Sequence, residues 1–127
     1  MKKGRKIPNV FARALRLDVL TDVVIKVGAS DKSIRAHRCV LGARSAVLER
    51  MFVNSEKKKE QPTTINIPDM SFEVCQALIS YLYDHIEEEE LRKYICELLD
   101  AAKAYEIADL KKACEEILQN GVMQLSI

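Results

Sequence analysis

The apolar residues of this chain recur at two different spacings, and the alternation between them limits the folds that the chain can form. Every second residue from Val23 to Val27 is apolar, so Leu20 to Val27 has the pattern of a half-buried strand. A polar turn follows, and Ser33 to His37 resumes the extended pattern, which predicts an antiparallel hairpin. Thr64 to Ile67 predicts a third short strand, which Pro68 ends.

Elsewhere the apolar residues recur at helical spacing. A short amphipathic helix is predicted over Pro8 to Leu17, with Pro8 and Asn9 as start signals. Two short helices are predicted after the hairpin, and the side chain of Ser45 is placed to cap the second of them. The broadest apolar face follows the third strand, on a helix that Asp69 or Ser71 caps. We expect this helix at the centre of the core.

Two further helices complete the predicted order. The acidic run Glu87 to Glu90 suits the first turn of a helix and is interpreted as a helix start that continues to Ala102, not as a ligand cluster. The final helix carries Leu110 and stops at Asn120-Gly121. The charged stretch N-S-E-K-K-K-E-Q, residues 54–61, is predicted to be an exposed connection. The prediction is an α+β fold, a small three-stranded sheet flanked by about six helices.

The length of 127 residues fits one domain with a single core. We expect residues 1–8 to be a flexible basic N-terminus, 9–121 to be the domain and 122–127 to be a C-terminal tail. The net charge of +1 gives no global attraction to nucleic acid or to anionic membranes. The basic cluster at residues 2–6 is either a nuclear address or a solvated chain end. No apolar run is long enough to span a membrane, so an intracellular protein of the cytoplasm or nucleus is expected.

The sequence carries no pattern typical of an active site, and we expect neither a cofactor nor a small-molecule substrate. Its four cysteines include no C-x-x-C pair, so metal binding is not expected. The cysteines are expected to be buried, reduced thiols. Metalloprotease and phosphate-loop motifs are missing, and no Ser or Cys stands beside a candidate base. Ser45 is interpreted as a helix cap and His37 as a hydrogen-bonded structural residue. The chain is therefore not predicted to be an enzyme.

Two stretches of the sequence resemble the signature of BTB/POZ domains. They are L-T-D-V-V-I-K-V with I-R-A-H-R-C-V-L-G-A-R-S-A-V-L-E-R-M-F, from Leu20 to Phe52, and I-N-I-P-D-M-S-F-E-V-C-Q-A-L-I-S-Y-L-Y, from Ile65 to Tyr83. L-L-D-A-A-K-A-Y-E-I-A-D-L-K-K-A-C-E-E-I-L is similar to the closing helices of the same family. The resemblance covers about Phe11 to Leu118 and is strongest to plant-type and MATH-linked BTB proteins.

The resemblance implies a homodimer in which the first helix packs against its twin. Phe11, Leu15, Leu17 and Leu20 would form that surface, and an amphipathic helix near a chain end needs an apolar partner in any case. The alternative is that this helix folds back onto its own core. One expected partner of this chain is therefore a second copy of itself.

The resemblance also implies a charged pair and a scaffold partner. Asp22 and Arg38 match a pair near the dimer groove, which either recruits a peptide, such as a corepressor peptide, or only fixes the hairpin against the next helix. Many relatives are adaptors of cullin ubiquitin ligases, and that comparison marks a candidate cullin-facing surface of Met51, Phe52, Val53, Asn54, Glu56 and Tyr83. The hydrophobic-x-Glu motif of strong cullin binders is not matched, because Asn54 stands two residues before Glu56. A dimerisation-only module is the remaining alternative.

Overall fold

Three short strands form the only sheet in the part of the chain that we describe. The computed structural model describes residues 8–59 and 62–125, with side chains as far as Asn120. The strands are β1 (Val23–Val27), β2 (Ser33–Ala36) and β3 (Thr63–Ile67), in the order β2-β1-β3. The central strand β1 is antiparallel to β2 and parallel to β3. The predicted hairpin and the predicted third strand are both confirmed.

The alternation predicted for β1 is present in the structure. Val23, Ile25 and Val27 are buried, whereas Lys26 is exposed. In β3 the same pattern recurs, with Ile65 and Ile67 turned into the core beside β1. One face of the sheet therefore supplies a floor of β-branched side chains on which helices pack.

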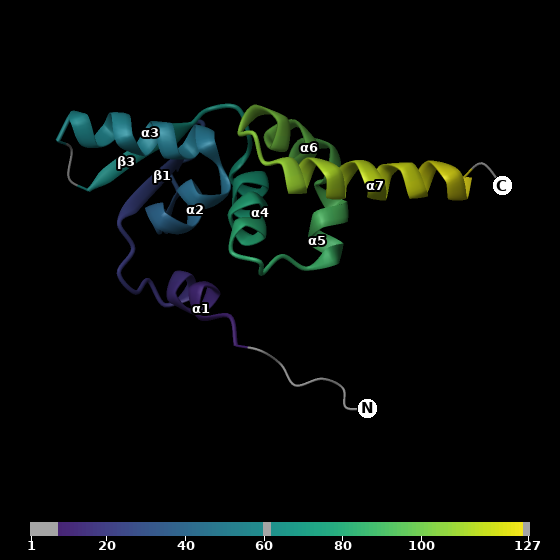
Figure 1. Ribbon diagram of the computed structural model, residues 1–127, viewed down its shortest axis with the longest axis horizontal. Coiled ribbons are helices and arrows are strands. Elements are labelled where there is room, and N and C mark those ends of the chain that lie inside the picture. The colour runs from purple at the N-terminus through teal and green to yellow at the C-terminus, as the bar shows by residue number, and fades with distance from the viewer. Residues whose placement is uncertain (1–7, 60–61, 126–127) are drawn as a thin grey trace.

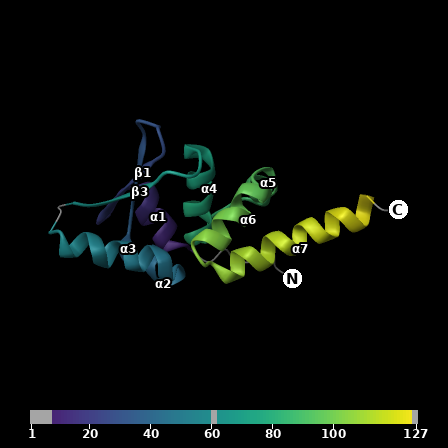
Figure 2. The same cartoon turned by 90° about the horizontal axis from the view of Figure 1, so that it is seen from above.

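The helices occupy the rest of the chain and lie on one side of the sheet and beyond its end (Figure 1). In the described residues they are α1 (Val10–Arg16), α2 (Arg38–Arg44), α3 (Ala46–Lys57), α4 (Phe72–Leu82), α5 (Glu88–Lys93), α6 (Ile95–Ala104) and α7 (Ala108–Leu125). Figure 2 shows α3 running along the sheet, α4 in the middle and α7 extending away from the body. Helix α1 lies below the body of the domain in Figure 1.

Helix α4 is the centre of the core, as its wide apolar face predicts. Its buried residues include Leu78, Ile79 and Leu82, and the side chain of Leu78 is fully buried. Burying one such side chain stabilises the fold by about 1.5–3 kcal/mol. Because α4 contacts α2 on one side and α6 on the other, it joins the sheet half of the domain to the helical half.

Side-chain caps fix the starts of three helices. The side chains of Asn9, Ser45 and Ser71 each accept a hydrogen bond from a backbone N–H in the first turn of α1, α3 and α4. Ser45 also donates to the carbonyl oxygen of Tyr105 at 2.7 Å and is buried. Its role as a helix cap is therefore confirmed, and Ser71, not Asp69, caps α4.

The prediction of an exposed connection after Phe52 is wrong in its first part. Helix α3 continues to Lys57, Ser55 is buried in it, and Glu56 pairs with Arg38 from α2. Glu and Lys are good helix formers, and the buried Ser55 with the ion pair holds this last turn against the domain. The charged composition of this stretch gave no indication that its first residues pack against the domain.

The single helix predicted from Glu87 to Ala102 is in fact two helices. The chain turns at Tyr94, which has φ −110° and ψ 27°, and this turn ends α5 and starts α6. Leu98, Ala101 and Ala102 of α6 are then buried, whereas α5 contains no buried residue. The described residues accordingly contain seven helices and not six, while the α+β fold class is confirmed.

Two predicted ends of the domain differ from the structure or fall outside it. Helix α7 runs through Asn120 and Gly121 to Leu125, because a glycine inside a helix costs about 1 kcal/mol relative to alanine but removes no hydrogen bond. The predicted helix stop at this position is therefore not observed. Residues 1–7 of the predicted basic N-terminus lie outside the described residues.

The cysteines are divided between the core and the surface. Cys75 and Cys114 are buried, and burial raises the pKa of the Cys75 thiol to about 12. Cys39 and Cys96 are exposed, so the expectation of buried thiols is wrong for these two, which lie on the outer faces of α2 and α6. Within the described ranges no group of three His, Cys, Asp or Glu could hold a metal ion, and no helix there is long and apolar enough to cross a bilayer.

Candidate interaction surface

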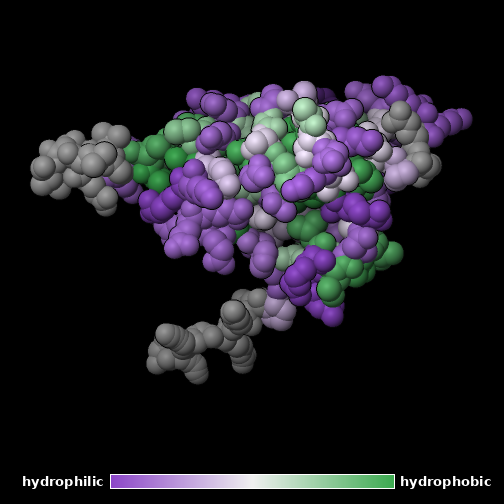
Figure 3. Space-filling model, turned by 180° about the vertical axis from the view of Figure 1, so that it is seen from behind, coloured by the Kyte–Doolittle hydropathy of each residue, from purple (hydrophilic) through white to green (hydrophobic). Residues whose placement is uncertain are grey.

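The exposed apolar residues of the domain gather near its N-terminal end. Among the described residues, all but one of the large exposed hydrophobic side chains belong to α1 or to the segment that follows it; we call this set, Val10, Phe11, Leu17, Val19 and Leu20, the α1 surface. Leu20 is 88% exposed and Phe11 is 57% exposed. Figure 3 shows the hydrophobic side chains of this region at the lower right of the molecule. The remaining exposed hydrophobic residue, Val53, lies on α3.

Three of the four residues predicted for the dimer surface are exposed, whereas the fourth belongs partly to the core. Phe11, Leu17 and Leu20 are exposed, but Leu15 is half-buried and packs against the core of its own chain. Sequence reasoning missed Val10 and Val19. Val10 lies seven residues before Leu17, so a count of helical positions would have placed the two on one face.

Helix α1 is attached to the domain through few contacts. The Asn9 amide donates hydrogen bonds to the carbonyl oxygens of Tyr83, at 2.8 Å, and Asp84, at 3.2 Å. Ala12 is the one buried residue of the helix. The inner side of α1 therefore rests on the end of α4, while its outer side stays uncovered.

The segment between α1 and β1 has an unusual backbone that side chains hold in place. Asp18 and Leu20 have φ of 57° and 55°, a conformation that residues with side chains rarely adopt. Arg35 of β2 and Thr21 both donate hydrogen bonds to Asp18, and these bonds lower the pKa of its carboxyl, with Thr21 as the largest cause. The strained backbone turns Leu20 outward, where it adds to the α1 surface.

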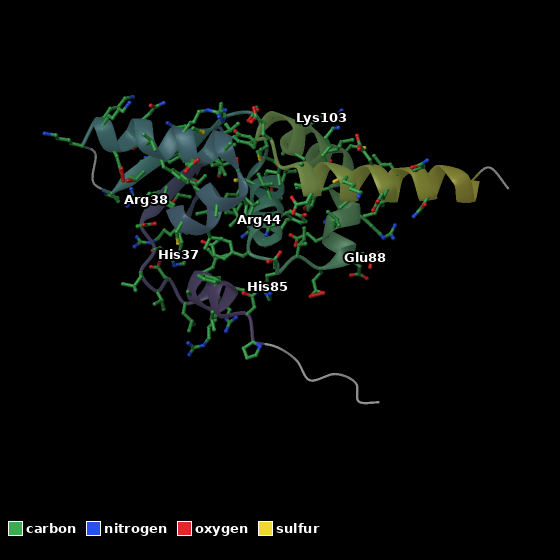
Figure 4. All side chains as sticks on the ribbon, in the orientation of Figure 1. His37, Arg38, Arg44, His85, Glu88 and Lys103 are labelled. Atoms are coloured by element: carbon green, nitrogen blue, oxygen red, sulfur yellow. The ribbon has the colours of Figure 1, made fainter. Side chains whose placement is uncertain are left out.

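A buried hydrogen-bond cluster ties this segment to the core. The Tyr83 hydroxyl accepts a hydrogen bond from the backbone N–H of His37 at 2.8 Å and lies 2.7 Å from Nδ1 of the same residue. The other ring nitrogen of His37 lies 2.7 Å from the carbonyl oxygen of Val19. Figure 4 shows His37 at the start of α2, on the side nearest α1. The interpretation of His37 as a hydrogen-bonded structural residue is confirmed.

Tyr83 does not belong to an exposed surface, contrary to its place in the predicted cullin-facing set. Its side chain is 2% exposed, and burial raises the pKa of its phenol to about 12. Phe52 is likewise buried. Met51 is half-buried and packs against the core, and of the three exposed residues of that set Val53 and Glu56 line a groove against α2 whereas Asn54 does not. A spacing along the sequence could not reveal which side of α3 meets α2.

An apolar hollow lies beside Phe11. It has a volume of about 390 Å³ and is bounded by α1, α2 and the end of α4. From α2, Val40 and Ala43 contribute to it. Sequence reasoning did not include these α2 residues, because they join the α1 surface only through the fold.

Asp22 and Arg38 lie in direct contact, together with a third residue. The Arg38 guanidinium donates to Asp22 at 3.1 Å and to Glu56 at 2.6 Å, and the backbone N–H of Arg38 donates to the other Asp22 oxygen at 2.7 Å. The side-chain bonds, from Asp22 first and then Glu56, raise the pKa of Arg38. The pair therefore links the start of β1, the start of α2 and the last turn of α3.

Comparison with known proteins agrees with the fold and with the signature residues. The model of the BTB/POZ domain family matches residues 11–121. Two BTB/POZ domain-containing proteins of Arabidopsis thaliana are 45% and 47% identical to this chain over 112 residues, which is 88% of this chain and 33% of each relative. The BTB and MATH domain-containing protein 42 of Caenorhabditis elegans is 34% identical over 127 residues, 95% of this chain and 30% of that protein. The resemblance to plant-type and MATH-linked proteins is thus confirmed.

A solved structure supports the same fold. The BTB domain of zebrafish PATZ1 superimposes with a TM-score of 0.70 at 22% identity and covers 88% of this chain and 87% of that chain. The present chain spans about a third of the length of the curated relatives named above. With the family match, the sheet order and the signature residues in agreement, the chain belongs to the BTB/POZ domain family, whose domains are protein-interaction modules.

Proposed function

We propose that this domain forms a homodimer through the α1 surface. The observation that carries the proposal is the concentration of exposed hydrophobic residues on one short helix and the segment after it. Each square ångström of apolar surface removed from water contributes about 25 cal/mol, so leaving Phe11 and Leu20 uncovered is unfavourable. A second copy supplies the same residues in return.

The α1 surface suits a twofold contact because an apolar hollow lies directly beside its exposed side chains. In a twofold dimer the same patch serves both partners, so it must be complementary to itself. Phe11 is exposed and forms one wall of the hollow that Val40 and Ala43 also line. We infer that the α1 surface of one protomer, with Phe11 at its centre, covers the hollow of its partner.

Analytical ultracentrifugation tests the homodimer directly. At micromolar concentration the chain should sediment at twice its mass of 14.4 kDa. Replacing Phe11 and Leu20 together by Asp should give a folded monomer, because two charges cannot be buried without partners. The matched control, Val53→Asp, changes an exposed apolar residue on α3 and should remain a dimer. A wild-type chain that stays monomeric would remove the basis of the proposal.

We further propose that the dimer is an adaptor. It would bind a cullin scaffold and bring to it substrates that another part of a longer protein binds. Support comes from membership of the family and from the resemblance described above, which implies a cullin-facing role for α3. Of the residues of α3 considered for that role, Val53, Asn54 and Glu56 are exposed. Asn54 occupies the position at which strong cullin binders carry an apolar residue.

A binding series with a purified cullin N-terminal domain tests the adaptor role. The wild-type chain should bind weakly. Asn54→Leu should bind about tenfold more tightly, because it places an apolar residue two positions before Glu56. Asn54 is exposed, so the substitution disturbs no buried group. Lys58→Leu adds the same side chain outside the motif and should change nothing. No binding by any of the three proteins would leave the dimer without a cullin role, and equal binding by all three would contradict the role given to position 54.

A further inference from the structure

A second hollow lies between α1, β2 and α4. It has a volume of about 600 Å³, which falls in the range of ligand sites, and we call it the α1–α4 hollow. None of its lining residues belongs to the α1 surface, and it shares none with the hollow that the proposed dimer covers. All of its lining comes from one chain, so the α1–α4 hollow exists in each protomer separately.

Helix α1 presents different faces to this hollow and to the proposed dimer contact. Ala12, Leu15 and Arg16 line the hollow and have the i, i+3 and i+4 spacing of one helix face. Val10 and Leu17 of the α1 surface stand seven residues apart and lie on the opposite face. A dimer formed through the α1 surface therefore leaves the α1–α4 hollow free for another partner.

The floor of the hollow is apolar and only partly covered. Leu15, Ile34 and Phe72 all line it, and each is half-buried although it packs against the core. Apolar surface that a partner removes from water contributes about 25 cal/mol for each square ångström. An apolar side chain of a partner therefore gains free energy by resting on this floor.

The rim of the hollow carries an excess of positive charge. Its charged Arg and Asp side chains are two guanidiniums, Arg16 and Arg35, and one carboxylate, Asp18. Arg35 donates to Asp18 at 3.0 Å, so these two charges already compensate each other. Arg16 makes no ion pair with a residue in the described ranges. Lys32 adds a cation at the edge, because its Nζ lies 5.3 Å from the centre of the Phe72 ring.

Three polar side chains of the lining are available to a peptide backbone. Within the part of the chain that the structure describes, the side chains of Gln76, Ser80 and His85 have no hydrogen-bond partner. Figure 4 shows His85 beyond the end of α4, beside α1. Amide, hydroxyl and imidazole groups can both donate and accept hydrogen bonds, so they can pair with the N–H and C=O groups of an extended segment.

We propose that the α1–α4 hollow binds a peptide segment of a partner protein in which an apolar side chain is flanked by Asp or Glu. The apolar side chain covers Leu15, Ile34 and Phe72, and the carboxylate meets Arg16. Charge complementarity selects this partner, because a basic segment would place like charges together at the rim. The site is separate from the proposed dimer contact and from the residues considered for a cullin.

A peptide selection tests the chemistry without requiring that the partner be identified first. The probe is a random dodecapeptide library displayed on phage, selected on the immobilised wild-type chain and depleted on the Arg16→Glu variant. Peptides that survive should be rich in Asp and Glu and should share an apolar residue. Surviving peptides that are basic or uncharged, or a selection in which no peptide distinguishes the two proteins, would overturn the proposal.

Matched variants then separate binding in the hollow from general charge. Arg13 and Arg16 both lie in the last turn of α1 and are exposed, but only Arg16 lines the hollow. In fluorescence anisotropy with a labelled selected peptide, Arg16→Glu should weaken binding by about tenfold or more, whereas Arg13→Glu should weaken it by less than about twofold. Equal losses in the two variants would contradict a site in the hollow.

Filling the hollow tests its position without a change of charge. Gln76 is exposed on α4, and Gln76→Trp should occupy the hollow and abolish peptide binding. Ser80→Phe, one turn later, is a second filling change, and circular dichroism shows whether each variant keeps the fold. Glu73→Trp places the larger side chain on α4 outside the lining and should leave peptide binding unchanged. Retained peptide binding in a folded filling variant would refute the site.

Sedimentation keeps this inference distinct from the homodimer. Arg16→Glu should still give the dimer mass, and the variant with Phe11 and Leu20 replaced by Asp should still bind the peptide. A wild-type chain that is monomeric and binds the peptide would refute the homodimer and support the hollow. Loss of peptide binding in the variant of Phe11 and Leu20 would place the peptide on the α1 surface and overturn the present proposal.

Discussion

Single buried residues decide how α1 is placed on the domain. The hydroxyl of Tyr83 serves two groups of His37, and His37 in turn reaches the carbonyl oxygen of Val19 in the segment that carries the α1 surface. The same Tyr83 offers its own carbonyl oxygen to Asn9 at the start of α1. One side chain and one backbone group of Tyr83 thus anchor both ends of the α1 region.

Removing the Tyr83 hydroxyl should destabilise the fold. Tyr83→Phe keeps the ring in the core but leaves the buried N–H of His37 without its acceptor, which costs about 1–3 kcal/mol. The free energy of unfolding in urea measures this loss. Tyr94→Phe is the control, because the Tyr94 hydroxyl has no hydrogen bond to a described residue, and its stability should stay within about 0.5 kcal/mol of wild type. A similar stability of both variants would contradict the anchoring role.

The sequence could predict the role of a single polar residue only where a local rule applies to it. Ser45 and His37 fit local rules for capping and for buried imidazoles, and both roles are observed. The partner of His37 lies at the end of α4, far along the chain, and nothing in the local sequence pairs it with Tyr83. The resemblance places Glu56 on a partner-facing surface, yet it contacts Arg38, because a helix continues where charge suggested a loop.

At the level of elements, Arg44 joins three helices. Its guanidinium donates to the carbonyl oxygen of Leu82 at 3.2 Å and to Asp84 at 3.0 Å, at the end of α4, and to Asp109 at 2.9 Å, in α7. Burial of Asp109 alone would raise the pKa of that carboxyl, but the hydrogen bond and positive charge of Arg44, with smaller contributions from other donors, together outweigh burial and lower it. Figure 4 shows Arg44 at the centre of the domain, between these elements.

Arg44→Met should loosen the contact between α7 and the rest of the domain. Methionine keeps much of the apolar volume but makes none of the three hydrogen bonds, and because both carboxylates are largely exposed we expect a loss of about 1–2 kcal/mol. Urea unfolding measures it. Arg92→Met breaks only an exposed pair with Glu88 in one helix and should cost less than about 0.5 kcal/mol. A larger loss for Arg92→Met than for Arg44→Met would contradict this ranking.

Element types could be predicted from the sequence better than element ends. The alternation in β1 and the wide apolar face of α4 each allow only one assignment, and both are observed. The turn at Tyr94 could not be predicted, because the apolar spacing continues through it and only packing of α6 under α7 requires the chain to bend. The continuation of α7 past Gly121 could not be predicted either, because Asn-Gly is a common signal for the end of a helix.

For the whole molecule, folding and self-association should be linked. If the α1 surface is covered by a second copy, the dimer is favoured over the unfolded chain at higher concentration, and the melting temperature rises with protein concentration. Differential scanning calorimetry over a hundredfold range of concentration measures this dependence. The variant with Phe11 and Leu20 replaced by Asp should melt at a temperature that does not depend on concentration. A wild-type melting temperature that is equally constant would exclude a linked dimer.

The fold of the whole molecule could be predicted from the sequence, but its surfaces could not. The residues that resemble the family include all three strands of the sheet, so the resemblance also predicted the topology. The hollow lined by Val40 and Ala43 arises only when α2 is set against α1, and the α1–α4 hollow arises only when α1 is set against β2 and α4, which no spacing along the chain reports.

The parallel pairing of β1 with β3 has a consequence for how fast the domain assembles. Val27 can meet Ile67 only after the hairpin, α2 and α3 have been synthesised, so the middle strand keeps one row of backbone groups unpaired until then. Closing such a long loop carries an entropic cost that local helix formation does not share, and slows the search for the native topology. A nascent chain on the ribosome therefore exposes the β1 edge until β3 has emerged.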